Sequence, residues 1–406
     1  MANSLILNSL EIQNFRLFRH LRIERLGRVN LIVGQNNIGK TCLLEALWVY
    51  AHRGELAAIW ELLEARGESI HYSTAYSRSV SPSASNAIVN LNDLQNIFHK
   101  RVGIKSNPKP IQIGPTTDVL RPQTDLNHPD LEANASQTLC LRVELFAERV
   151  NEQGQLQVQR LSPENAHKTP NSIPVLSAYF GKEIAYTQRL DYSSLLSQAS
   201  QKTSGNTCIF VPANALRAKQ ISKLWDEISL TELENSVLEA LRIIAPNISG
   251  VSLKERYGER VPFAKQEGLK KPIALRSLGE GINRLFGIVL ALVNAENGLL
   301  LIDEIESGLY HMVLPEIWRF IFKLAHELNV QLFASCHSWD CLEAFAQAVR
   351  DDEQEEALLI SLREHRSEKG KVAALLLDER KMTIATEDRS GDGVQSLLCW
   401  WRDCFY

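Results

Sequence analysis

The sequence lacks the long apolar segment that a membrane-spanning helix requires. Its longest apolar run near the glycine-rich segments is LFGIVLALV, nine residues at 285–293, whereas a helix needs about 20 apolar residues to cross a bilayer. The first residues, MANSLILNSLEIQNF, also lack the basic start and the apolar core of a secretory signal. We therefore expect a cytoplasmic protein without a membrane partner.

The cysteines show no pairing pattern, and the charge is nearly balanced. None of the seven cysteines forms a C-x-x-C pair, and no His cluster stands near them at zinc spacing. Such a set is typical of reduced thiols that pack as small core residues. A net charge of −4 excludes overall attraction to nucleic acid, so any such contact must come from a local patch. Two series are candidates, the arginines at every third residue from Arg16 to Arg28 and the basic residues of 100–121, although solvated faces explain both more simply.

The apolar pattern alternates between strand and helix along most of the chain. Residues 5–33 are interpreted as two strands, and a helix is expected to begin at Lys40. Thr231 and Glu234 stand at capping-box spacing before a helix that ends ahead of Pro246. The further elements that we expect are helices at 55–66, 281–297 and 314–328, and strands at 139–149, 155–161, 207–213, 299–303 and 330–335.

The middle of the chain has a different composition. Residues 72–86 are rich in serine, and residues 103–137 contain five prolines with little periodicity. These stretches favour loops within an insertion. No sustained heptads and no internal repeats are present, so the insertion does not form a coiled coil.

The segment GQNNIGKT fits the phosphate-binding pattern G-x-x-x-x-G-K-[ST], with a strand before it and a helix after it. The glycines let backbone N–H groups point at phosphate oxygens, and the helix presents its positive end to the same anion. Lys40 would add a charge on the β- and γ-phosphates, and the Thr41 hydroxyl would bind Mg²⁺. The residues expected to hold ATP are Gly34, Gln35, Asn36, Asn37, Ile38, Gly39, Lys40, Thr41 and Cys42.

Two further strands end in polar residues. The apolar run LLLI delivers Asp303 to a strand end, where ligands bind in open α/β sheets. Asp303 would hold Mg²⁺, and Glu304 would orient or deprotonate the attacking water. His337 follows the next strand along the chain, and a neutral imidazole there would bond the γ-phosphate or the water. The catalytic candidates are therefore Lys40, Glu304 and His337.

The segment SLGEG, at 277–281, completes an ordered set of motifs. The order is P-loop, SLGEG, Asp-Glu strand and strand-end histidine, and it resembles that of the ABC-type ATPases. Their signature reads L-S-G-G-Q or L-S-G-G-E, which Ser277, Gly279 and Glu280 match and Arg276 and Leu278 do not. The resemblance implies that the signature contacts the nucleotide held by a second subunit. The donors are suitable, because a Ser hydroxyl, a Gly N–H and a helix N-terminus all favour an anion.

Three features resemble the RecF, SMC and OLD (overcoming lysogenization defect) ATPases. They are the N-terminal segment LEIQNFRLF, the segment LIDEIESGLYH that contains Asp303, and the long interval between P-loop and signature. The resemblance implies an α/β fold: an ABC-type head with a mixed central sheet, an antiparallel N-terminal lobe and a central insertion. Its parts would be 1–66, 67–206 and 207–406, in one composite ATPase domain. Arg16 would approach the nucleotide, as N-terminal arginines do in this group.

The same resemblance implies an ATP-driven homodimeric switch that uses Mg²⁺. OLD proteins carry a nuclease domain with Asp-x-Asp, and no Asp-x-Asp follows His337. A nuclease-like effector would therefore be a separate protein, as in anti-phage defence. Three alternatives stay open: a RecF-like repair ATPase that binds DNA directly, a nucleotide-sensing scaffold with little hydrolysis, and a transporter motor subunit. The long insertion argues against the transporter motor subunit.

Overall fold

A computed structural model describes most of the chain. The described residues are 5–69, 91–106, 108–116, 137–150, 156–161, 172–190, 205–256, 258–351, 356–365, 368 and 370–377. The serine-rich segment 72–86 and the aromatic C-terminus lie outside them. Among the described residues, no helix is both long and apolar enough to cross a bilayer. The chain groups into two compact units: the first combines 1–8, 25–44 and 206–406, and the second combines 9–24 and 45–205.

The first unit is built on a six-stranded mixed sheet with the order β16-β15-β3-β14-β13-β9. Its strands are β3 (Val29–Val33), β9 (Cys208–Val211), β13 (Leu299–Ile302), β14 (Gln331–Ser335), β15 (Ala357–Glu364) and β16 (Val372–Leu377). All pairs are parallel except β15 with β16. Every residue of β3, β13 and β14 is buried, as expected for strands covered on both faces.

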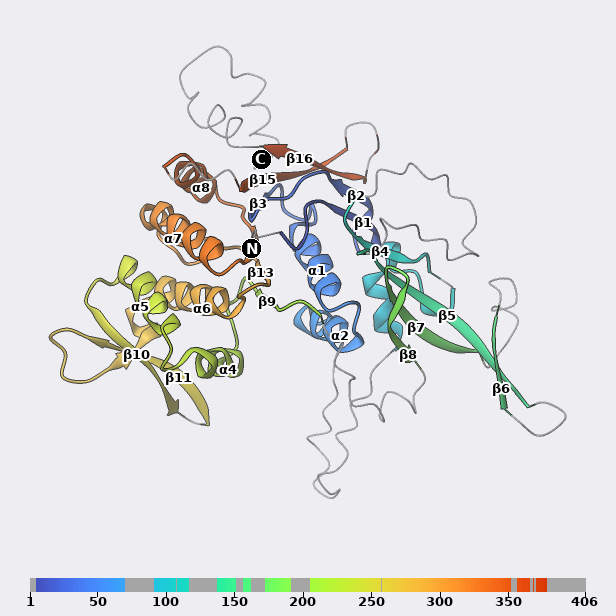
Figure 1. The fold of residues 1–406 in the computed structure, drawn as a ribbon, viewed down its shortest axis with the longest axis horizontal. Helices are drawn as coiled ribbons and strands as arrows, with labels where there is room; N and C mark the ends of the chain where they lie inside the picture. The colour runs from blue at the N-terminus through green and yellow to red at the C-terminus, as the bar shows by residue number, and fades with distance from the viewer. Residues whose placement is uncertain are drawn as a thin grey trace, which may run out of the picture. The chain divides into compact units, whose positions relative to one another are not determined.

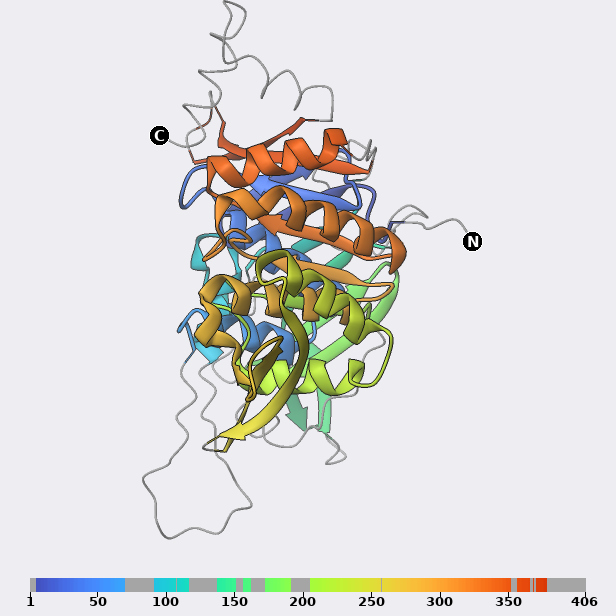
Figure 2. The same cartoon turned by 90° about the vertical axis from the view of Figure 1, so that its left-hand side faces the viewer.

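Three helices form a layer along this sheet: α6 (Glu280–Asn294), α7 (Leu314–Glu327) and α8 (Trp339–Asp351). Figure 2 shows them stacked one above another in front of the strands. They share one hydrophobic core with the sheet, in which Phe286, Trp318 and Phe345 are fully buried. Apolar residues at helical spacing on the inner faces explain this layer.

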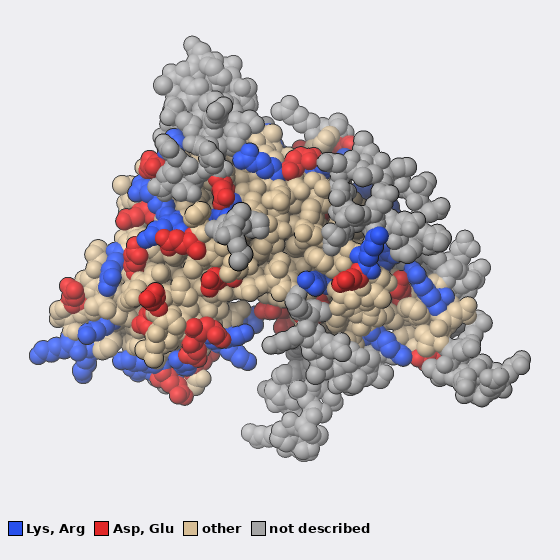
Figure 3. All heavy atoms as spheres, in the orientation of Figure 1, with Lys and Arg blue, Asp and Glu red and all other residues tan. Residues whose placement is uncertain are grey.

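A small three-stranded sheet, β10 (Ile248–Arg256), β11 (Glu259–Gln266) and β12 (Ile273–Ala274), also belongs to the first unit. It lies beside α4 (Ala218–Ile228) and α5 (Leu233–Ile244), as Figure 1 shows. Positive and negative side chains are interspersed over this region of the surface (Figure 3). One such pair joins Arg260 to Asp226 at 2.7 Å. On the face that Figure 3 shows, this region therefore carries both signs of charge.

The second unit is built on an antiparallel sheet with the order β2-β1-β4-β5-β7-β8, in which β6 also pairs with β5. The strands are β1 (Leu10–Phe15), β2 (Phe18–Ile23), β4 (Ile111–Gly114), β5 (Leu139–Val150), β6 (Leu156–Arg160), β7 (Ile173–Phe180) and β8 (Glu183–Arg189). The unit also holds α2 (Leu56–Ala65) and three short 3-10 helices, η1 (Leu91–Ile97), η2 (His99–Arg101) and η3 (Ile104–Ser106). The N-terminal hairpin thus shares one sheet with the strands of the predicted insertion. The predicted fold class, with a mixed sheet and an antiparallel N-terminal lobe, is confirmed.

The fold corrects three details of the sequence interpretation. Residues 5–33 form three strands, not two, because the chain leaves the strand conformation between Ile23 and Val29. In this break, Gly27 lies so close to Glu356 that a Cβ would meet Glu356 O at 2.1 Å. The capping box is wrong: Glu232 is the N-cap of α5, and the Glu234 carboxylate accepts the N–H of Leu230 instead. Helix α6 ends at Asn294, three residues earlier than expected.

Candidate functional site

The strand order brings three polar loops to one edge of the sheet of the first unit. Strand β14 lies between β3 and β13 and is parallel to both. The P-loop follows β3, Asp303 follows β13, and Ser335 ends β14. Since parallel strands end at the same edge, residues far apart in sequence meet there.

The P-loop backbone takes the conformations that its glycines permit. Gly34 and Gly39 have φ angles of 149° and 107°, and Asn37 has 65°. A Cβ at Gly34 would also lie 2.6 Å from Leu362 O. Helix α1 (Lys40–Ala51) begins within the loop, so Lys40, Thr41 and Cys42 form its first turn. The local conformation is therefore that of a phosphate-binding loop at a helix N-terminus.

The Lys40 side chain folds back over the loop. Its Nζ donates hydrogen bonds to Gly34 O at 2.7 Å and to Gln35 O at 3.1 Å. Burial lowers the pKa of Lys40, and negative groups around it, Asp303 among them, act in the opposite direction. The ammonium is thus held beside the backbone groups that would surround a phosphate.

Asp303 is the centre of a hydroxyl–carboxylate cluster. Thr41 Oγ1 lies 3.0 Å from Asp303 Oδ2, and Ser335 Oγ donates to Asp303 Oδ1 at 2.5 Å. Ser335 Oγ also accepts the N–H of Glu304 at 2.9 Å. One carboxylate with a Thr hydroxyl is a hard oxygen set, which fits Mg²⁺ bound together with phosphate oxygens. The two residues predicted as Mg²⁺ ligands, Thr41 and Asp303, therefore lie within hydrogen-bonding distance of each other.

The turn after β13 depends on Arg284, a residue that the motif analysis did not identify. Arg284 is 4% exposed and donates to the carbonyls of Asp303 at 2.6 Å and Glu304 at 3.2 Å. It also donates to Pro212 O at 2.5 Å. Burial lowers the pKa of Arg284, and the carboxylates of Asp303, Glu304 and Glu306 oppose this effect. Glu304 has a φ of 50°, an uncommon conformation for a residue with a side chain.

Glu306, which the motif analysis also missed, organises the loop that carries His337. Its Oε1 accepts the N–H groups of His337 and Ser338, at 2.8 and 3.1 Å. The same oxygen lies 3.0 Å from His337 Nδ1, and the His337 side chain is about half exposed. The imidazole is therefore oriented by a buried carboxylate.

The signature residues lie at the surface of the same unit. A short 3-10 helix, η5 (Leu275–Leu278), precedes Gly279, whose φ is 121° and which is the N-cap of α6. No side chain caps this helix. Ser277, Gly279 and Glu280 are exposed, and Arg276 Nε pairs with Glu280 Oε1 at 2.8 Å. Among the described residues, no hydrogen bond or ion pair joins Ser277, Gly279 or Glu280 to the P-loop.

The arginine series does not form one basic surface. In the second unit, Arg16 is buried and pairs with Glu45 at 2.7 Å and Glu68 at 2.8 Å. In the first unit, Arg28 is buried and pairs with Glu356. These two arginines stabilise their own units. A role of Arg16 at the nucleotide stays a prediction.

Comparisons with known proteins agree with this site. Residues 6–105 match the model of an AAA ATPase domain, and residues 224–340 match that of an AAA domain described as a putative AbiEii toxin of a type IV toxin–antitoxin system. An "ATP/GTP phosphatase" of Helicobacter pylori is 24% identical over 364 residues, which span 85% of this chain and 89% of the relative. The "DNA replication and repair protein RecF" of Thioalkalivibrio sulfidiphilus is 46% identical over 43 residues, 11% of this chain and 12% of its own length.

Two solved structures are also similar. The SMC head bound to the C-winged helix domain of ScpA overlays with a TM-score of 0.44 and 13% identity, over 93% of this chain and 99% of the other. The SMC head domain from Thermotoga maritima gives 0.40 and 13%, over 92% and 100%.

The P-loop, the Asp303 cluster and the two matching domain models define a P-loop ATPase. More particularly, residues 6–105 and 224–340 are similar to AAA-type ATPase domains, and a short stretch is similar to RecF.

Proposed function

We propose that this ATPase is a dimeric switch, in which two copies close on two ATP molecules. The observation that carries the proposal is the exposed, uncapped corner at Ser277–Glu280. It offers a hydroxyl and the first N–H groups of α6, all suited to a γ-phosphate. No described residue of the same chain's P-loop uses these donors. A second copy would bring its own P-loop to them.

Each residue of the site then has a definite role. The P-loop N–H groups and Lys40 bind the β- and γ-phosphates. Glu304 orients the attacking water and accepts its proton, and His337, held by Glu306, bonds the γ-phosphate. Thr41 and Asp303 would hold Mg²⁺, which supplies charge neutralisation on the phosphates when bound. Hydrolysis removes the γ-phosphate that joins the two copies, so the dimer opens.

Sedimentation with and without ATP tests the switch. The Glu304→Gln variant keeps the size of the side chain and loses its basicity, so it should accumulate as a nucleotide-bound dimer. Adding Ser277→Arg to that variant should prevent the dimer and leave ATP binding to the monomer intact. If Glu304→Gln stays monomeric at saturating ATP, or dimerises equally with Arg at 277, the proposal is wrong.

Association with DNA is a second candidate, supported by the stretch similar to RecF. The interspersed charges of the β10–β11 region give it little additional support. Salt-dependent binding of duplex DNA by the ATP-bound Glu304→Gln dimer would favour it. If binding instead requires another protein, the separate effector of the anti-phage hypothesis would be favoured.

A further inference from the structure

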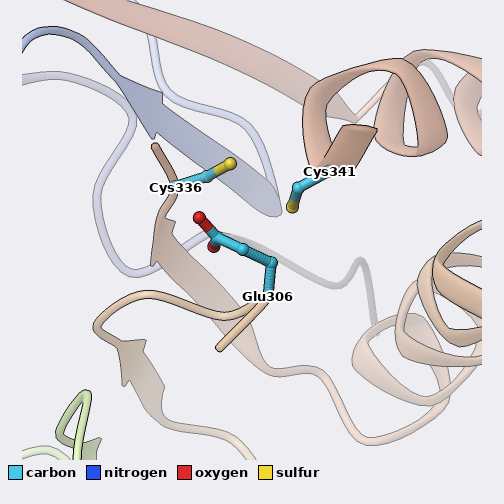
Figure 4. A group of neighbouring side chains, drawn as sticks. All are labelled: Glu306, Cys336 and Cys341. Carbon is cyan, nitrogen blue, oxygen red and sulfur yellow. The ribbon is translucent and has the colours of Figure 1, made fainter. Parts of the chain in front are cut away.

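Two thiols and a carboxylate converge beneath the nucleotide-binding edge, where no role has been assigned to the thiols. Glu306 follows the Asp303–Glu304 turn, Cys336 follows β14, and Cys341 lies in the first turns of α8. One ligand atom of each lies within 4.8 Å of those of the other two, and all three residues are buried. Figure 4 shows the Glu306 carboxylate beside the Cys336 sulfur, with the Cys341 sulfur close by.

The carboxylate of Glu306 is incompletely satisfied. The residue is 8% exposed, and its Oε1 accepts two backbone N–H groups and faces His337 Nδ1. Its Oε2 is buried and has no hydrogen-bond partner among the described residues. A buried carboxylate oxygen without a partner carries a desolvation cost, which a cation would remove.

The Cys336 thiol donates to Ser338 O at 3.2 Å, and one backbone donor also lies beside its sulfur. The N–H of Ser338 lies 3.3 Å from Cys336 Sγ, and the same N–H contacts Glu306 Oε1. Hydrogen bonds from the backbone to a ligand atom are the usual outer support of a metal site. The donor set of two sulfurs and one oxygen favours zinc, because soft thiolates select Zn²⁺ over Mg²⁺.

We propose that Cys336, Cys341 and Glu306 bind one Zn²⁺ ion. Tetrahedral zinc with bonds of about 2.3 Å to sulfur places its ligand atoms about 3.5–3.8 Å apart, so the three side chains would need to close by no more than about 1.3 Å. Two Zn–S bonds form, and each thiol releases its proton to solvent. Water would take the fourth position. The ion would join the Asp303–Glu304 turn, the end of β14 and the start of α8.

The zinc site goes beyond the proposed switch. Because zinc binding is measured without nucleotide, its result does not depend on whether the protein dimerises. Chelator-treated, reduced full-length protein is titrated with Zn²⁺ against a chromophoric chelator, and separately with Co²⁺ to record thiolate-to-metal absorption bands. The wild type should bind one ion per chain and show these bands. Cys341→Ala and Cys336→Ala should each weaken binding by roughly tenfold or more and reduce the intensity of the bands, because one thiolate remains.

Two further variants separate ligand loss from misfolding. Glu306→Gln keeps an oxygen to accept the N–H groups of His337 and Ser338, so it should fold normally and bind Zn²⁺ more weakly. Cys208→Ala removes a thiol on β9, away from the cluster, and should bind zinc as the wild type does. The proposal is overturned if the reduced wild type binds no zinc, or if Cys341→Ala binds it equally well. It is also overturned if the protein purified without reductant or chelator contains a Cys336–Cys341 disulfide in place of the ion.

Discussion

Arg284 links the signature helix α6 to the Asp303–Glu304 turn through two backbone carbonyls, and it also donates to Pro212 O. Replacing it with Met keeps most of the apolar stem and removes all the donors. Asp303 O would lose its donor, whereas Glu304 O and Pro212 O keep the N–H groups of Ser307 and Ala215. Arg284→Met should therefore destabilise the protein by about 1–3 kcal/mol. The turn would also lose its position, so turnover at saturating ATP should fall roughly tenfold or more.

Thermal unfolding and steady-state ATP hydrolysis measure the two effects of Arg284→Met. Arg276→Ala is a matched control for stability, because Arg276 is 73% exposed and its pair with Glu280 is a surface ion pair. Its unfolding free energy should change by no more than about 0.5 kcal/mol. If Arg284→Met is as stable and as active as the wild type, the carbonyl contacts do not position the turn.

The residues expected to bind phosphate and metal could be predicted from the sequence. The residues that hold them in position could not. Lys40, Thr41 and Asp303 stand in patterns whose spacing reflects phosphate and metal geometry. Arg284 and Glu306 act on segments brought close only by the strand order, so no local pattern marks them. Cys336 and Cys341 are five positions apart and show no zinc spacing, and their relation to Glu306 likewise appears only in the fold.

At the scale of elements, two glycines of α6 differ in the space available for a side chain. A Cβ at Gly281 would lie 2.6 Å from Gly308 O, whereas a Cβ at Gly287 would first meet Leu216 Cδ1, at 3.9 Å. Alanine is favoured over glycine inside a helix by roughly 1 kcal/mol. Gly287→Ala should therefore raise the thermal midpoint. Gly281→Ala should lower it, because the clash with backbone exceeds the helix preference.

Differential scanning calorimetry of the two alanine variants separates packing from propensity. Both substitutions change the same residue type on the same helix, so the unfolded chain is affected equally. A rise in both midpoints would mean that the loop at Gly308 yields, and that the close approach does not hold the signature helix in place.

Elements with a strong local pattern were predicted well, and those that depend on partners were not. The buried strand at 299–302 and the helix at 314–327 follow from apolar runs and helical spacing. The break before β3 was missed, and the end of α6 was placed three residues too late. The close approach of Gly27 to Glu356 and the loop at Ala295 leave no local pattern. The β1–β2 hairpin joins the sheet through the pairing of β1 with β4, a long-range contact that no local pattern predicts.

At the scale of the whole molecule, the proposed switch predicts that two inactive variants restore each other. Lys40→Ala removes the phosphate charge from one chain, and Ser277→Arg blocks the signature of another. If each nucleotide lies between the P-loop of one copy and the signature of the other, a mixed dimer has one intact site and one doubly damaged site. Random equal pairing then gives at most about a quarter of wild-type activity, because half of the pairs are mixed and each mixed pair has one intact site.

A site formed within a single chain predicts a different result for the same mixture. If Ser277 and Lys40 of one molecule bound a single nucleotide together, every chain in the mixture would carry one damaged half, and activity would stay at the level of the separate variants. A Lys40→Ala, Ser277→Arg double variant mixed with Lys40→Ala is the matched control, since neither chain then supplies a working P-loop. Activity in that control would reveal a contaminating ATPase, so only a gain specific to the first mixture supports a site shared between two copies.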